Sequence, residues 1–339
     1  MKLFDTILKR QKSHVGIDIG SYAIKVVELS LEKDSLEIKN LAYTKIENPN
    51  SRDQLIQAVK ESTARANILN KEVNISVSGP SVIVRFIELP RMSGNELRNA
   101  ISFEAEKYIP FGIEEVIIDH QLLIPHLGDN KMLVLLVAVK KELITERINL
   151  LSEAGLFART VDVASLANFN AFLTGANRKK YEVAAFIDIG ARATDINIID
   201  RDILYFTRSI QIGGNDITKV LADALSIDFK SAESIKVKPS DKASEISENI
   251  SPVLHNIIDE IRPSFSYYEN LSGKSIERVY LTGGSSRIIN FHNMLKEDLE
   301  MEIEQWDPLE RIELHPSIDK RLADSIKDQL GVAVGLALR

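Results

Sequence analysis

The sequence predicts an α/β protein of two similar lobes, and the strongest sign is an internal repeat. The motif Ile17-Asp18-Ile19-Gly20 recurs as Ile187-Asp188-Ile189-Gly190, and apolar residues alternate with polar ones after each copy. This pattern is typical of a hairpin in which one apolar strand turns at a glycine into the next. Two copies this far apart indicate two related halves, because the units of a solenoid recur at shorter intervals.

Length and composition agree with two lobes and exclude several classes of function. A chain of 339 residues that is 44% hydrophobic can bury more core than one domain usually holds. The net charge is −7 with both signs well mixed, so no basic face is available to neutralise nucleic-acid phosphates. The lack of cysteine excludes a disulfide framework, a thiol nucleophile and a thiolate zinc site. No apolar run approaches the roughly 18 residues of a membrane span.

Each half is predicted to contain a three-stranded unit followed by a helix. After the first motif we expect strands at 24–29 and 36–43, a helix at 53–68 and a strand at 73–77. After the second we expect strands at 195–199 and 203–209 and a helix at 215–225. Such an order gives mixed sheets covered by helices. Pro263 lies inside a helical stretch at 247–271 and is expected to kink or divide it.

An additional module is predicted between the halves, at 81–161. Ser93 and Glu96 form a capping box at the start of a helix that Pro110 ends. Strands at 116–124 and 133–139 and a helix at 142–154 follow, which describes a small α+β insertion. An insertion into a duplicated fold is a natural place for a partner-binding surface.

These elements divide the chain into five parts. The N-terminal tail is predicted to be solvated, although its apolar and basic residues leave open a weak membrane-surface or partner-binding helix. The parts are the tail (1–14), the first-lobe core (15–80 with 162–180), the inserted α+β subdomain for partner docking (81–161), the second-lobe core (181–226 with 275–339) and a helical outer subdomain of the second lobe (227–274).

The repeated motif has the parts that a nucleotide phosphate chain requires. Glycine lets backbone N–H donors approach phosphates closely, and Mg²⁺ is held by one or two carboxylates. Asp18 and Asp188 end their strands, and Gly20-Ser21 and Gly190-Ala191 follow them. Two facing hairpins of this kind can hold one phosphate chain in a cleft between lobes. The alternative is that both are ordinary Asx-type turns.

Two glycine pairs favour the nucleotide interpretation. Gly283-Gly284-Ser285 follows the predicted strand 279–282 and precedes a helix at 288–299, so a base or ribose can lie against bare backbone there. Gly213-Gly214 likewise opens a helix. Neither pair fits the spacing of a dinucleotide fingerprint or a P-loop.

Taken together, these motifs resemble those of the actin, sugar-kinase and heat-shock chaperone superfamily. The order Asp18-x-Gly20, Asp188-x-Gly190-x-x-x-Thr194-Asp195, Gly213-Gly214 and Gly283-Gly284 covers nearly the whole chain. The insertion is similar to that of the FtsA-like branch. Three segments resemble the PilM family of type IV pilus assembly proteins: 20–29, 161–172 and, most specifically, Glu104-Ala105-Glu106-Lys107-Tyr108-Ile109-Pro110-Phe111.

The resemblance implies an actin-like (ribonuclease H-like) two-lobed fold that binds ATP or ADP with Mg²⁺ between its lobes. Asp18 and Asp188 would lie near the metal, Lys25 would reach the phosphates, and Asp188 is the one catalytic candidate. Because the sequence offers no other candidate for a catalytic base, we expect at most slow ATP hydrolysis. The further nucleotide contacts implied are Gly20, Ser21, Gly190, Ala191, Thr194, Gly213, Gly214, Glu233, Lys236, Gly283, Gly284 and Ser285. The second phosphate turn departs from the pattern, since Arg192 and Ala193 replace a glycine-rich run.

The same resemblance implies a cytoplasmic scaffold at the inner face of the inner membrane. Its partner would be the N-terminal cytoplasmic peptide of PilN, bound between the first lobe and the insertion, so that the protein reaches the membrane only through PilN. Other pilus motor components and a homodimer are left open, and the expected process is pilus biogenesis and twitching motility. The residues expected at the peptide groove are Phe103, Tyr108, Ile109 and Phe111.

Three other functions are open to the sequence. A small-molecule kinase would need a base aspartate in the cleft, and no motif marks one. An FtsA-like filament former usually carries a C-terminal membrane anchor, whereas this chain is expected to end in a buried helix. A GspL-like component of type II secretion would continue into a transmembrane span.

Overall fold

The computed structural model describes residues 13–32, 35–175, 182–239 and 243–339. Residues 1–12, which hold most of the N-terminal tail, lie outside the described residues. Within the described part, no helix has both the length and the apolar character needed to cross a membrane.

The first lobe is built on a six-stranded sheet whose spatial order is β14-β3-β2-β1-β4-β8. The strands β1, β2 and β3 form an antiparallel meander, and β4 then pairs with β1 in parallel. The helix α2 (Arg52–Arg65) begins at Ser51, whose side chain accepts a hydrogen bond from the Gln54 backbone. The strands are β1 (Ser13–Ile19), β2 (Ala23–Glu32), β3 (Ser35–Lys45), β4 (Glu72–Val77), β8 (Phe157–Val163) and β14 (Glu313–Leu314).

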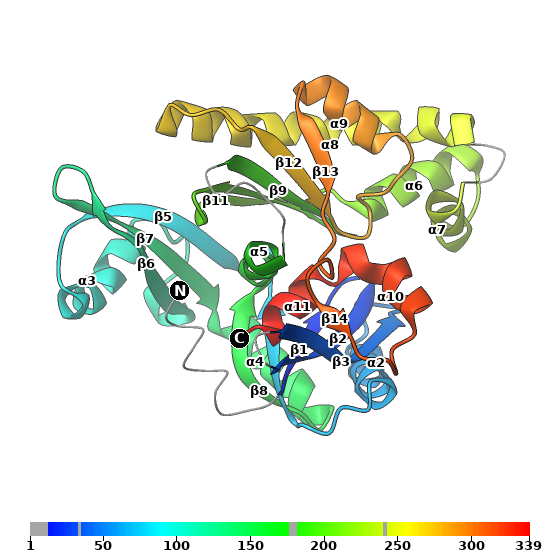
Figure 1. The fold of residues 1–339 in the computed structure, drawn as a ribbon, viewed down its shortest axis with the longest axis horizontal. Helices are drawn as coiled ribbons and strands as arrows, with labels where there is room; N and C mark the ends of the chain where they lie inside the picture. Colours follow the sequence, from blue (N-terminus) through cyan, green and yellow to red (C-terminus); the bar gives the residue numbers. More distant parts are fainter. Residues whose placement is uncertain (1–12, 33–34, 176–181, 240–242) are drawn as a thin grey trace.

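The second lobe repeats this plan with a five-stranded sheet of order β11-β10-β9-β12-β13. Its central strand β9 reads as a nearly continuous apolar run because both faces are covered. Figure 1 shows the long helix α8 lying along this sheet. The strands are β9 (Val183–Ile189), β10 (Thr194–Asp200), β11 (Ile203–Ile210), β12 (Arg278–Thr282) and β13 (Glu302–Gln305), and the helices are α6 (Gly214–Leu225), α7 (Phe229–Val237), α8 (Ala243–Ser272) and α9 (Phe291–Leu299).

The inserted module is a three-stranded sheet, β5-β7-β6, covered on one face by α3. The predicted capping box at Ser93 and Glu96 is confirmed, with both reciprocal hydrogen bonds present at the start of α3. In Figure 1 the module extends to the side of the two lobes. Its elements are β5 (Val82–Pro90), α3 (Gly94–Glu106), η1 (Ile113–Glu115), β6 (Val116–Leu127) and β7 (Lys131–Lys140).

Two expected boundaries need correction. The module ends at residue 140 and not at 161, because α4 (Lys141–Glu153) buries Leu150 and Leu151 in the first-lobe core and β8 pairs with β4. The last part of the chain also leaves the second lobe, since β14 pairs with β3 of the first sheet. The elements that follow β14 are α10 (Lys320–Ile326), η2 (Lys327–Gln329) and α11 (Gly331–Ala337).

The helices α5 (Ala164–Gly175) and α11 join the lobes between the two sheets (Figure 1). They approach so closely that a Cβ on Gly335 would lie 1.7 Å from the Ala167 carbonyl oxygen. On its other side α11 meets β1, where a Cβ on Gly16 would lie 2.2 Å from the Ala333 oxygen. Phe172 of α5 stacks on Phe186 of the second sheet at 4.4 Å. Close backbone packing of α5, α11 and β1 therefore joins the two lobes.

Candidate functional site

A cleft of about 830 Å³ opens between the lobes, within the size range of small-molecule sites. The first lobe contributes the turn after β1 and the end of β4, and the second contributes the turn after β9, the Gly283-Gly284 turn and α7. The predicted site residues that line it are Asp18, Gly20, Ser21, Lys25, Asp188, Gly190, Ala191, Glu233, Lys236, Gly283, Gly284 and Ser285.

Three predicted contacts lie behind this wall. Thr194 is fully buried and donates its hydroxyl to the Ile212 carbonyl at 2.9 Å, so it supports the second hairpin from behind. Gly213 and Gly214 are not among the cleft-lining residues either. Gly214 instead donates its backbone N–H to the Gly190 carbonyl at 2.9 Å, which fixes the phosphate turn against α6.

The first hairpin presents a buried ion pair to the cleft. Asp18 and Lys25 face each other in the β1–β2 register, and Lys25 Nζ lies 2.8 Å from Asp18 Oδ2. The turn between them closes through a hydrogen bond from the Gly20 N–H to the Ala23 carbonyl. The first hairpin thus presents to the cleft the Asp18 carboxylate on β1 and the compact Lys25 cation on the adjacent strand β2.

The second hairpin presents two carboxyl groups. Asp188 and Asp195 face each other in the β9–β10 register. Asn168 of α5 donates its amide to Asp188 Oδ2 at 2.7 Å. Burial is the main reason that the pKa of Asp188 rises to about 7, and the neighbouring Asp195 raises it further against the opposing pull of Lys25. Burial also raises the pKa of Asp195.

These groups fit a nucleotide with Mg²⁺. With its pKa raised to about 7, the Asp188 carboxyl is partly protonated near neutral pH. A divalent cation beside it would favour the ionised carboxylate. Among the described residues no cluster of three or more acidic or histidine ligands could hold a metal without help. Mg²⁺ usually keeps several waters and is bound by one or two carboxylates together with substrate phosphates.

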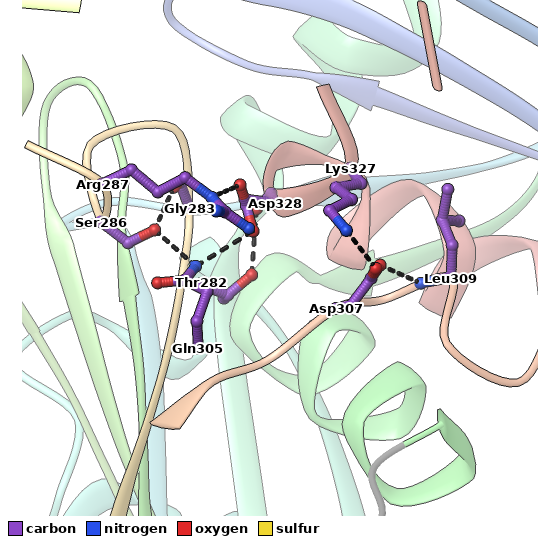
Figure 2. A network of polar contacts seen from close by, with 9 residues as sticks. All are labelled: Thr282, Gly283, Ser286, Arg287, Gln305, Asp307, Leu309, Lys327 and Asp328. Atoms are coloured by element: carbon purple, nitrogen blue, oxygen red, sulfur yellow. Dashed lines mark hydrogen bonds and ion pairs between the residues drawn. The ribbon is translucent and has the colours of Figure 1, made fainter. Parts of the chain in front are cut away.

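The Gly283 turn packs directly on the second hairpin. Gly283 has φ +93°, and a Cβ there would lie 2.3 Å from Asp188 Oδ1. Its backbone N–H donates to the Asp328 carbonyl at 2.7 Å. Figure 2 shows how the Asp328 side chain then joins Arg287 and Gln305, with Arg287 Nη2 3.0 Å from Asp328 Oδ1. This network ties the turn to η2, close to the lobe connection.

Glu233 and Lys236 lie together on the α7 wall of the cleft. Lys236 Nζ lies 2.6 Å from Glu233 Oε2 and also donates to the Thr218 hydroxyl and the Gly214 carbonyl. Burial lowers the pKa of Lys236, although Glu233 partly offsets the shift.

The four expected groove residues do not share one environment. Phe103 is 74% exposed and Tyr108 is 39% exposed, whereas Ile109 is only 7% exposed and belongs to the core of the module. Phe111 is half-buried, and Lys140 Nζ lies 4.3 Å from the centre of its ring. The expectation that Ile109 lines a groove is therefore wrong, because its side chain packs under α3.

Two polar groups that line the cleft, Arg147 of α4 and Asp195 of β10, and one buried behind it, Asn168 of α5, were not predicted as site residues, and only Asp195 belongs to a motif that was noticed. Asn168 lies within the segment 161–172 that resembled the PilM family, but nothing in its spacing marks it as a partner of Asp188. Tertiary contacts alone bring these groups together.

The raised pKa of Asp188 makes the nucleotide-free protein lose stability as pH rises. The folded state keeps the Asp188 proton up to about pH 7, while the unfolded chain releases it near the ordinary value of 3.8. The free energy of unfolding therefore falls between these values. We expect Asp188→Asn to flatten this slope, so that its stability relative to the parent is greater at pH 8 than at pH 5. Urea unfolding in EDTA measures it, and parallel pH profiles would contradict the assignment.

A protein family and several solved structures are similar to this chain. The model of the family described as type IV pilus assembly protein PilM matches residues 16–339. A solved structure of a PilM–PilN type IV pilus biogenesis complex is similar at 28% identity and a TM-score of 0.86, covering 97% of this chain and 98% of that one. The expected resemblance is thereby confirmed.

More distant structures show the fold alone. The ethanolamine utilization protein EutJ from Carboxydothermus hydrogenoformans matches at 18% identity and a TM-score of 0.58, covering 97% of this chain and 90% of that one. MreB5 of Spiroplasma citri, solved with ADP, matches at 12% identity and a TM-score of 0.52, covering 94% and 95%. The predicted actin-like two-lobed fold is confirmed.

Proposed function

Because this chain belongs to the family of the type IV pilus assembly protein PilM, we propose that it is an ATP-binding scaffold of the pilus machinery that captures the N-terminal cytoplasmic segment of PilN. It would act in the cytoplasm, at the inner face of the membrane in which PilN is anchored, and would link PilN to the motor side. The observation that carries the proposal is the cleft, whose two Asp-x-Gly hairpins face each other across the lobes.

The cleft residues divide naturally between the two ends of a nucleotide. Asp18 and Asp188 would hold Mg²⁺ together with the phosphates, which supplies charge neutralisation between the lobes. The turns at Gly20 and Gly190 would offer backbone N–H donors, and Lys25 a point charge. Glu233 and Lys236 would meet the ribose or base on the α7 wall. Each element is positioned before ligand arrives, which reduces the ordering cost of binding.

The partner-binding surface is best placed where the module meets the first lobe. Lys140, the last residue of β7, lies over the Phe111 ring, and Lys141 at the start of α4 donates to the Glu114 carbonyl at 2.6 Å. The exposed Tyr108 and Phe103 lead into this junction along the chain. In the similar structure the partner is PilN. An extended PilN segment could add main-chain pairing at a sheet edge and insert apolar side chains beside Tyr108 and Phe111.

Charge substitution at the exposed aromatic residues tests this placement. We expect Tyr108→Glu and Phe103→Glu to weaken binding of a PilN N-terminal peptide, by about 2 kcal/mol where the side chain is a buried anchor of the complex. Fluorescence anisotropy of a labelled peptide measures the affinity. Thermal stability and ATP binding should stay near parental values, because neither side chain is core.

The matched control is Tyr267→Glu, since Tyr267 is 58% exposed on α8 of the other lobe. It should leave peptide affinity unchanged. The placement is refuted if all three variants bind the peptide like the parent, or if Tyr267→Glu weakens it equally.

A further inference from the structure

The helix α4 contributes an arginine, Arg147, to the cleft, and no described residue forms a hydrogen bond or ion pair with it. Arg147 lines the cleft beside Asp18, yet its guanidinium has no hydrogen bond or ion pair with the described residues. Its Nε is buried without a partner. Burial lowers the pKa of Arg147, while Glu146 and Asp18 oppose that shift, so the group is desolvated without being neutralised. Arg147 is only partly buried, so a ligand in the cleft can reach its guanidinium, while at least one of its N–H donors has no protein partner.

The other cleft cations all have partners. Lys25 is paired with Asp18 at 2.8 Å, Lys236 with Glu233 at 2.6 Å and Arg287 with Asp328 at 3.0 Å. Arg192 donates to Asn50 Oδ1 at 3.0 Å, and Lys45 lies over the Tyr22 ring. Among the cations of the described cleft, Arg147 is thus the one without a hydrogen bond, ion pair or ring contact, which makes it the most available to a ligand anion.

The position of Arg147 in the cleft indicates which anionic group of a nucleotide it would bind. The wall that suits a ribose or base is α7 of the second lobe, at Glu233 and Lys236. Arg147 comes from the first lobe, with the Asp18 carboxylate as its electrostatic neighbour. A nucleotide whose base lies at α7 and whose phosphates lie between the hairpins would therefore present its phosphate end to Arg147. The planar guanidinium can donate two parallel hydrogen bonds to such a group.

We propose that Arg147 binds the terminal phosphate of ATP and so makes the cleft prefer the triphosphate over the diphosphate. The inference rests on the proposed nucleotide site and adds a residue that distinguishes ATP from ADP. ADP offers no group at that place, so it leaves the guanidinium uncompensated. The preference would come from one side chain on α4, whereas the hairpins hold the phosphates common to both nucleotides.

Isothermal titration calorimetry with ATP and with ADP, both with Mg²⁺, tests the proposal. We expect Arg147→Gln to weaken ATP binding about 10-fold to 100-fold, the range for one charge-assisted contact, and to change ADP binding less than about 3-fold. Arg147→Lys should recover part of the ATP affinity, since it restores the charge but not the fork. The control Arg65→Gln, an exposed arginine at the end of α2, should change neither.

A second measurement separates ligand binding from a structural role. Because Arg147→Gln removes a partly buried charge without breaking an ion pair, its nucleotide-free melting temperature should equal or exceed that of the parent. A parent that binds ATP and ADP, with an Arg147→Gln variant that loses both equally or neither, would overturn the assignment of Arg147 alone. A parent that binds neither nucleotide would overturn the proposed function and this inference with it.

Discussion

Alanine in place of Asp188 is expected to abolish most of the stabilisation that ATP and Mg²⁺ give the protein. A ligand that binds only the folded state raises stability by mass action, about 2.7 kcal/mol at 100 times its dissociation constant. In the proposed site, Asp188 would be the carboxyl of the second hairpin near the metal, and Asp18 would be its counterpart across the cleft. We expect Asp18→Ala to remove the shift as well. Differential scanning fluorimetry with and without MgATP measures both.

The matched control is Asp223→Ala, because Asp223 is exposed on α6 and outside the cleft. It should keep the full ATP response. The two-hairpin site is wrong if Asp18→Ala and Asp188→Ala both respond to ATP like the parent while remaining folded.

Valine in place of Gly335 is expected to give the largest loss of stability. The added Cβ would lie 1.7 Å from the carbonyl oxygen of Ala167 and 2.4 Å from its carbonyl carbon. Both are backbone atoms of α5, so the clash is relieved only if α5 and α11 separate. Overpacking usually costs 1–3 kcal/mol, and a rigid backbone contact belongs at the upper end, about 3 kcal/mol or more. Urea unfolding of the nucleotide-free protein measures the change.

Gly94→Ala provides the control for this substitution. Gly94 begins α3, and a Cβ there meets nothing within 4 Å. We expect its stability to match or slightly exceed that of the parent, because alanine loses less conformational entropy on folding. Equal stability of Gly335→Val and the parent would show that the two helices do not pack as described.

The features that could be predicted from sequence are those that local chemistry determines. Asp-x-Gly occurs at each hairpin because the strand must end and the backbone must bend at the glycine, and Asp18 and Asp188 lie at the strand ends just before those turns. The Gly283 turn was visible for the same reason, since its positive φ and its contact with Asp188 both exclude a side chain. The capping box at Ser93 is likewise a local signal.

What could not be predicted depends on contacts between distant segments. The apolar segment after α3 that holds Ile109 looks the same in sequence whether it is core or groove, and only its packing against α3 decides. The end of the module was missed because nothing local shows that α4 buries its apolar side chains in the first-lobe core or that β8 pairs with β4. Pro263 was expected to kink or divide its helix, and α8 continues through it without being divided.

The most direct test of the nucleotide site is a crystal structure of the protein with MgATP. We expect the phosphate chain between the turns at 20–21 and 190–191, with Mg²⁺ near Asp18 and Asp188 and the base beside Glu233 and Lys236. Nucleotide bound outside this cleft, or a cleft that stays free of it at saturating concentration, would contradict the central claim.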